Sequence, residues 1–173
     1  MLKKIIPFLL VFSFISSLYA SEKENVIRAV VLERIAQFVS YKDLSKEFNI
    51  CVYKNKTLSK SFKNLYDGRS YKNLPIKVLD VSVINKLEIC NVVYISNLTK
   101  RTKAKILKKS KEQILLVSQN VDDINNGYMI ALYFEKKKLK FNINQGAIVD
   151  AGLKVNYRLL TVASKVVNPR KAN

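Results

Sequence analysis

The segment KFNINQGAIVDAGLKVNYRLL, residues 140–160, decides the C-terminal architecture of this chain. Phe141-Asn142-Ile143 alternates apolar and polar side chains, which is typical of a strand with one exposed face. Asn144 and Asn156 are favourable residues for helix N-termini, and Gly152 between them suits a helix that ends in a left-handed residue. The segment offers no obvious nucleophile, metal ligand or phosphate-binding loop. It therefore specifies architecture, and the surrounding residues have to indicate the function.

Two strands and a helix are predicted around this segment. Residues 128–134 are apolar at every position, which predicts a strand that is covered on both faces. A charged turn at 135–138 leads into an alternating strand over 139–143, so the two strands should pair antiparallel, with the second at the sheet edge. A last helix is predicted from 156 to about 167, and Pro169 ends it.

Upstream of residue 128, helical stretches alternate with short apolar strands. Ser21 and Glu24 have the spacing of a capping box ahead of a helix predicted over 22–40, whose apolar residues recur every three or four positions. The predicted strands then cover 48–54, 74–81, 91–95 and 112–119, with helices over 57–68 and 98–109 between them. This alternation indicates crossover connections. The predicted fold is α/β, with a mostly parallel sheet, helices on both faces and a C-terminal antiparallel hairpin at the edge.

The N-terminus has the three parts of a secretory signal peptide. Residues 1–4 carry positive charge, 5–15 are mostly apolar, and 17–20 end in small residues, which predicts cleavage after Ala20. The alternative is an uncleaved membrane anchor. The apolar stretch is, however, shorter than the roughly 20 residues that a spanning helix needs.

Cleavage there defines the predicted organisation of the chain. Residues 1–20 form the signal peptide, 21–168 form one domain, and 169–173 form a loose tail. The exported chain is not expected to span a membrane.

The charge of the chain is strongly positive. Lys and Arg number 31 against 13 Asp and Glu, which gives a formal net charge of +18. For an exported protein this charge favours acidic protein surfaces, anionic lipid headgroups or wall polymers over nucleic acid. The alternative interpretation is that the lysines only solvate the surface, since they are spread along the chain without interleaved aromatic residues. No nucleic-acid partner is predicted.

The two cysteines, Cys51 and Cys90, each lie at or near the start of a short apolar strand. If these strands are parallel neighbours with similar register, the sulfur atoms lie close together in a compartment that permits oxidation. We therefore predict a disulfide, and the alternative is two buried free thiols. Two cysteines without any histidine cannot complete a tetrahedral shell, so no metal site is predicted.

The residues give no support for an enzyme. The chain has no histidine to act as a general base, its Ser and Thr residues show no triad pattern, and its four glycines form no phosphate-binding loop. Asp122-Asp123 is the one adjacent carboxylate pair, and we interpret it as a turn. The sequons at Asn55 and Asn97 are interpreted as surface turns or a helix start. The prediction is a binding protein without catalytic activity or cofactor.

Residues 127–163 closely resemble the C-terminal signature of the YfiR-type family of small periplasmic proteins. That signature runs as a Gly-Met-Ile strand, a basic turn, an Arg-Phe-Glu-Ile-Asn strand, a Gly-Leu-Lys stop and a Leu-Leu helix. The family also begins with a signal peptide and an apolar helix, and continues with strands similar to ICV and CNVVYIS in this chain. The matching positions are Met129, Ile130, Phe141, Ile143, Asn144, Ala151, Gly152, Leu153, Lys154, Leu159 and Leu160.

The chain departs from the family pattern at three places. Asn142 stands where the family has Glu, Tyr128 stands where it has a second Gly, and residues 33–36 replace an aromatic-rich segment of the first helix. Ligand or partner contacts that those positions make in relatives are therefore not predicted for this chain, whereas the same fold is expected.

The resemblance implies a repressor in the periplasm of a Gram-negative cell. Such a protein dimerises and binds the periplasmic sensor domain of an inner-membrane diguanylate cyclase, and so lowers cyclic-di-GMP synthesis and biofilm formation until an envelope or redox signal releases it. The rival hypothesis is a solute- or wall-polymer-binding accessory protein of a receptor or transport system.

Candidate contact residues follow from a repressor's need for both charge and apolar anchors. Lys103, Lys105 and Lys108, which we expect to be exposed, are candidates for steering an acidic partner, together with the lysines of the hairpin. Exposed apolar side chains of the first and last helices are expected to supply the anchors and a homodimer face.

Overall fold

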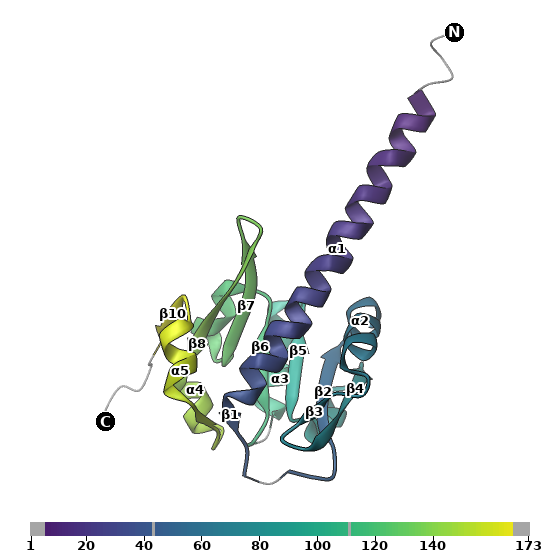
Figure 1. The fold of residues 1–173 in the computed structure, drawn as a ribbon. Helices are drawn as coiled ribbons and strands as arrows, with labels where there is room; N and C mark the ends of the chain where they lie inside the picture. Colours follow the sequence, from purple (N-terminus) through teal and green to yellow (C-terminus); the bar gives the residue numbers. More distant parts are fainter. Residues whose placement is uncertain (1–5, 43, 111, 168–173) are drawn as a thin grey trace.

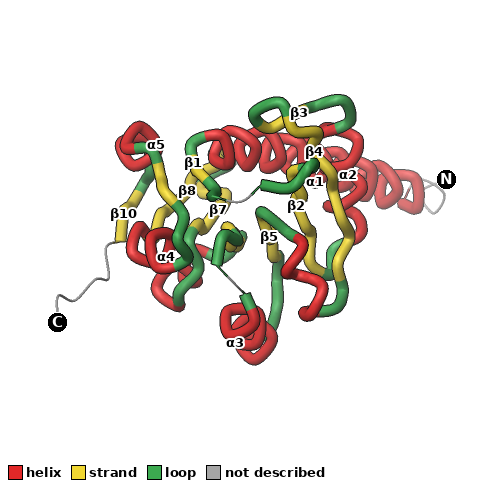
Figure 2. The backbone as a smooth tube through the Cα atoms, turned by 90° about the horizontal axis from the view of Figure 1, so that it is seen from below, coloured by secondary structure: helices red, strands yellow, loops and turns green. Residues whose placement is uncertain are grey.

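A computed structural model describes residues 6–42, 44–110 and 112–167, with side chains described from residue 22 onward. Its centre is an eight-stranded, mostly parallel sheet with helices on both faces, as predicted (Figures 1 and 2). In their order across the sheet, the strands are β10 (Lys165–Val167), β8 (Lys138–Asn144), β7 (Ile130–Glu135), β6 (Leu115–Ser118), β5 (Val92–Ile95), β2 (Phe48–Tyr53), β4 (Leu74–Val81) and β3 (Ser70–Tyr71).

Five neighbouring strands, from β4 through β2, β5 and β6 to β7, run parallel. Short helical crossovers connect them, because parallel neighbours cannot be joined by a tight turn. These crossovers are α2 (Lys56–Tyr66), η2 (Ile84–Ile89), α3 (Lys100–Lys109) and η3 (Val121–Asn126). The hairpin of β7 and β8 is antiparallel, and so is the pair of β3 and β4.

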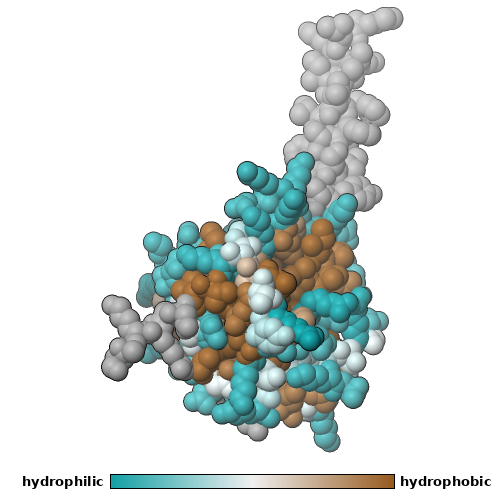
Figure 3. Space-filling model, turned by 60° about the vertical axis from the view of Figure 1, so that its left-hand side comes forward, coloured by the Kyte–Doolittle hydropathy of each residue, from teal (hydrophilic) through white to brown (hydrophobic). Residues whose placement is uncertain are grey.

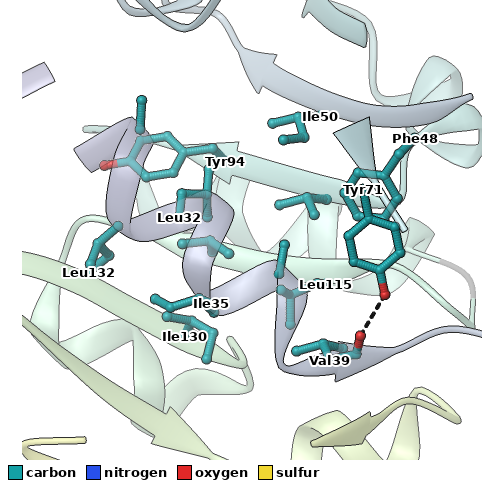
Figure 4. Close-up of a cluster of buried hydrophobic side chains, with 14 of the residues drawn as sticks. Leu32, Ile35, Val39, Phe48, Ile50, Tyr71, Tyr94, Leu115, Ile130 and Leu132 are labelled. Carbon is teal, nitrogen blue, oxygen red and sulfur yellow. Dashed lines mark hydrogen bonds between the residues drawn. The ribbon is translucent and has the colours of Figure 1, made fainter. Parts of the chain in front are cut away.

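Apolar side chains from the two faces of the sheet form two separate cores. On one face, α1 (Ile6–Gln37) and α2 cover the larger core. Figure 4 shows Leu32 and Ile35 of α1 among side chains of the central strands, including Tyr94 and Ile130. On the other face, α3 and η2 cover the smaller core. Full burial of each such Leu or Ile contributes roughly 1.5–3 kcal/mol, so α1 is held mainly by packing.

Two tyrosines also hold α1 and the residues after it in place, one at the end of α2 and one in the edge strand β3. The hydroxyl of Tyr66 donates to the carbonyl oxygen of Ala29 at 2.5 Å, and that of Tyr71 donates to the carbonyl oxygen of Val39 at 2.7 Å (Figure 4). The ring of Tyr71 stacks on Phe48 with 4.0 Å between the ring centroids. The end of α1 therefore has a fixed position over β2, β3 and β4.

The predicted bounds of the first helix are wrong at both ends. The helix begins at Ile6, so Ser21 and Glu24 lie inside it and do not form a capping box at its start. It ends at Gln37, and Val39–Ser40 forms strand β1, which pairs antiparallel with β9 (Lys154–Val155). Among the described residues, no helix is both long and apolar enough to cross a membrane.

The predicted last helix is also wrong in its second half. After the short helix α4 (Gln145–Asp150), helix α5 covers only Tyr157–Val162. Residues 165–167 then form β10, which lies parallel to β8, so β10 and not β8 is the sheet edge. Pro169 and the predicted tail at 169–173 lie outside the described residues.

Candidate functional site

Cys51 and Cys90 form the predicted disulfide, with their Cα atoms 5.8 Å apart. Cys51 lies on β2 opposite Val93 of β5 in parallel register, and Cys90 precedes β5 by two residues. Both cysteines are buried in the smaller core, below α3 and η2. The prediction that their strands are parallel neighbours is confirmed.

A polar cavity of about 530 Å³ lies beside Cys90, at the amino ends of the parallel strands. The backbone N–H of Asn49 donates to the side-chain oxygen of Asn91 at 2.7 Å, and the side-chain amide of Asn49 donates to the carbonyl oxygen of Ile89 at 2.9 Å. These bonds hold the loop that carries Cys90 against the start of β2. The amide side chains thus position the cysteine for bridging.

Most residues of the family signature have an architectural role, because they lie in the core. Those that are buried are Met129, Ile130, Ile143, Asn144, Leu153 and Leu159. Phe141, Gly152 and Leu160 are half-buried, whereas Lys154 is exposed on β9. The signature therefore describes how β7, β8, α4 and α5 pack, and only Lys154 is freely available to a partner.

Asn144 and Gly152 show how the signature determines the local structure. The side-chain oxygen of Asn144 accepts from the N–H of Ala147 at 2.9 Å and so begins α4, while its amide donates to the carbonyl oxygen of Ile124 at 3.0 Å. Gly152 has a φ of +70° just after α4, and Gln113 donates to its carbonyl oxygen at 2.8 Å. Both helix signals read from the sequence at these positions are confirmed.

Lys103 is not exposed, contrary to expectation. Only 9% of the residue is accessible, and its ammonium nitrogen lies 2.6 Å from a carboxylate oxygen of buried Asp123. The same carboxylate oxygen accepts from the hydroxyl of Ser118, and the hydroxyl of Tyr128 donates to the carbonyl oxygen of Lys103 at 3.2 Å. Burial, with a smaller contribution from Asp123, raises the pKa of Tyr128 well above its ordinary value. This cluster fastens η3 to α3.

Lys105 and Lys108 are exposed on α3, as expected. Helix α3 covers the face of the sheet opposite to α1 (Figure 2). The structure therefore does not bring these two lysines together with the exposed apolar residues of the first helix. Their steering role remains a proposal that concerns the α3 face alone.

Three apolar side chains at the C-terminal end of the fold are exposed to solvent. Tyr157 and Val162 of α5 are each 67% accessible, and Val166 of β10 is 40% accessible. We call these residues the α5 patch. Figure 3 looks onto this side of the molecule and shows hydrophobic surface between hydrophilic side chains. Because soluble surfaces rarely gather large apolar side chains without a function, the patch is a candidate docking surface.

A second apolar group lies on α1, where Val26, Ile27 and Val30 are between 36% and 39% accessible. We call these residues the α1 patch. Arg28, in the same turn of the helix, contacts the β7–β8 hairpin, since its guanidinium lies 4.6 Å from the ring centroid of Phe134. The expectation that the first and last helices expose apolar side chains is confirmed.

No metal-binding arrangement occurs in the part of the chain that the structure describes, where no three His, Cys, Asp or Glu side chains gather. The Asp122-Asp123 pair lies in η3, as expected for a turn. Asp123, however, also holds the buried Lys103, a partner twenty residues away that the sequence did not indicate.

Two solved structures share this fold. A conserved domain protein from Vibrio cholerae O1 biovar El Tor matches with a TM-score of 0.57 and 13% identity, over 80% of this chain and 60% of that one. An ABC domain from Streptococcus pneumoniae, in complex with L-Trp, matches with a TM-score of 0.51 and 9% identity, over 69% of this chain and 55% of that one. The chain thus spans little more than half the length of either protein, and such low identities show a common fold alone.

The sequence itself identifies the family. No curated protein matches the chain. The sequence profile of a family described as YfiR/HmsC-like, DUF4154, matches residues 25–164, from the exposed face of α1 to the residue before β10. The chain belongs to the YfiR/HmsC-like family.

Proposed function

We propose that this protein is a non-catalytic periplasmic regulator that binds the periplasmic sensor domain of an inner-membrane diguanylate cyclase and lowers cyclic-di-GMP synthesis. The observation that carries the proposal is the family match over residues 25–164. The exposed apolar patches of the same domain support it, since a binding protein needs anchors that are accessible before the partner arrives.

The α5 patch is the proposed anchor for the sensor domain. Tyrosine is enriched among the residues that contribute most to binding, and Tyr157 is 67% accessible. The backbone beneath it is held in place, because the N–H of Asn156 donates to the carbonyl oxygen of Phe38 at 2.8 Å. An anchor on a rigid base loses little conformational entropy on binding.

Repression requires a difference in affinity between two states of the target. A regulator can lower cyclase activity only if it binds the inactive state of the sensor domain more tightly than the active state. We propose that the α5 patch makes contacts that only the inactive state offers. The α1 patch is the proposed homodimer face, since Val26, Ile27 and Val30 lie on the side of the helix away from its buried residues.

Export is part of the proposal. We propose that residues 1–20 are removed after Ala20, which leaves the domain in the periplasm with its first helix starting near Ser21. The mature N-terminus can be determined by mass spectrometry of the periplasmic fraction. An intact Met1 in the membrane fraction would contradict this cleavage.

The anchor is tested by measuring affinity for the isolated sensor domain of the cyclase. The variant Tyr157→Ala with Val162→Ala should bind roughly 30-fold more weakly or worse, which is the usual effect of losing an interface hot spot. The matched control is Val83→Ala with Ile89→Ala, since these residues are 50% and 54% accessible and lie outside the α5 patch. Equal losses in the two variants would contradict the assignment of the anchor.

A further inference from the structure

The turn of the β7–β8 hairpin consists of two lysines in an unfavourable backbone conformation. Lys136 has a φ of +48° and Lys137 a φ of +63°. A two-residue hairpin turn of this kind requires positive φ at both positions, and Asn-Gly is the pair that suits it best. Residues with other side chains adopt this region only at an energetic cost, and such strain is often found where a side chain has a function.

The charges at this turn are not neutralised within the domain. Lys136, Lys137 and Lys138 are all exposed, and no ion pair involves them among the described residues. The nearest carboxylate in the sequence, Glu135, is paired with Lys140 instead. We call residues 136–138 the hairpin tip. It carries three adjacent positive charges that remain available to a partner.

The hairpin tip projects beyond the sheet. β7 pairs with β6 only through Ile130 and Ala131, so the rest of the hairpin extends past the end of its neighbour. Figure 1 shows the hairpin pointing in the same direction as the N-terminal part of α1. The contact between Arg28 and Phe134 fixes the hairpin against α1. The tip is therefore a charged protrusion on a rigid base.

We propose that the hairpin tip docks on the headgroups of anionic phospholipids. A protrusion with three lysines suits a flat, negatively charged surface, where each Lys near the surface strengthens binding roughly fivefold. Half-buried Tyr133, Phe134 and Leu139 lie behind the lysines, the arrangement of charge and aromatic residues that suits a membrane interface.

This inference rests on the proposed function only for the identity of the membrane. Docking by the tip would keep the regulator at the membrane that contains its target, and would orient the domain with its α1 end toward the lipid. An acidic protein surface is the other binding partner that three lysines could serve. Lipid vesicles without any protein distinguish the two.

The test measures co-sedimentation of the exported protein, as recovered from the periplasm, with phosphatidylcholine vesicles that contain or lack phosphatidylglycerol. We expect binding only with phosphatidylglycerol, and a loss on the order of 100-fold when Lys136, Lys137 and Lys138 are replaced by Gln. The matched control replaces Lys105, Lys108 and Lys109 of α3 by Gln. It removes the same charge from another exposed site and should change binding by no more than about threefold, because distant charges are screened.

A second variant separates docking from folding. Lys136→Asn with Lys137→Gly should raise the urea midpoint of unfolding, since the turn becomes favourable, while weakening vesicle binding on the order of 20-fold. Equal losses in the two Gln variants would overturn the proposal, because net charge alone would then explain binding. Failure of the wild-type protein to bind anionic vesicles would also overturn it. Neither result depends on whether the protein represses the cyclase.

Discussion

The ammonium nitrogen of Lys103 lies 2.6 Å from the carboxylate of Asp123, and the two side chains are only 11% and 6% accessible. A buried ion pair of this kind connects α3 to η3 across twenty residues of sequence. Removal of one partner leaves the other charge buried without compensation, which is more costly than removal of both.

Replacement of Lys103 by Met should therefore lower the free energy of unfolding by about 3–5 kcal/mol, because Asp123 loses its partner. The double change Lys103→Met with Asp123→Leu should recover most of this loss. Lys105→Met, at an exposed position of the same helix, is the control and should change stability by less than about 0.5 kcal/mol. Urea denaturation measures all three. A Lys103→Met variant as stable as the control would show that the pair is not stabilising.

The disulfide should stabilise the domain by restricting the unfolded chain. Cys51 and Cys90 are 39 residues apart, and closing a loop of that length contributes about 4 kcal/mol in the chain-entropy description. We expect the double variant Cys51→Ala with Cys90→Ala to lose about this amount in urea denaturation. Thiol labelling of the exported wild-type protein without reductant should detect no free cysteine, and two labelled cysteines per chain would contradict the bridge.

Gly152 should tolerate a side chain less well than Gly68, although both have a φ of +70°. A Cβ atom at Gly68 meets open space, whereas one at Gly152 would lie 2.7 Å from the amide nitrogen of Gln113. Gly68→Ala should thus cost about 1 kcal/mol for the backbone conformation alone, and Gly152→Ala should cost more. Adding Gln113→Ala should remove part of the difference between the two variants. Equal thermal stabilities for the two alanine variants would mean that the Gln113 side chain moves away from the new Cβ atom at little energetic cost.

Alkaline pH should destabilise the fold through its buried tyrosines. Burial raises the pKa of Tyr94 to about 12, against the lowering effect of Arg28, and it also raises the pKa of Tyr66. The folded state then binds these protons more tightly than the unfolded state, in which tyrosine has a pKa of about 10. The free energy of unfolding should be constant with respect to these groups below that value, and should fall as pH rises from about 10 toward 12. Tyr94→Phe should make the fall shallower, and an unchanged slope would contradict the role of Tyr94.

Local sequence signals predicted the starts of α4 and α5 and the buried strands well. The strand over 74–81 has the bounds of β4, Asn144 and Asn156 begin α4 and α5, and Gly152 follows α4 in a left-handed conformation. These features depend on residues that are adjacent in the sequence. The disulfide was predictable for a related reason, because each cysteine lies in or just before an apolar strand and the two strands are parallel neighbours.

Several of the errors arise from contacts between distant residues. Val166 fits the apolar period of a helix, yet it pairs with Ile143 of β8 once the chain turns at Ala163 and Ser164. In the sequence, Lys103 cannot be distinguished from the many exposed lysines. Asp123 lies close to it only after the crossover that follows β6 has folded. The apolar period of a segment does not show which strand it pairs with or which distant side chains it contacts.

The central claim is that this family member represses a diguanylate cyclase through the α5 patch. It is tested most directly by the cellular concentration of cyclic-di-GMP in a deletion strain that retains the cyclase and is complemented with different alleles. We predict that deletion raises cyclic-di-GMP and that the wild-type allele and Val83→Ala with Ile89→Ala restore the low level. Tyr157→Ala with Val162→Ala, exported in equal amount, should leave the concentration high. An unchanged concentration in the deletion strain, under both oxidising and reducing conditions, would contradict the account.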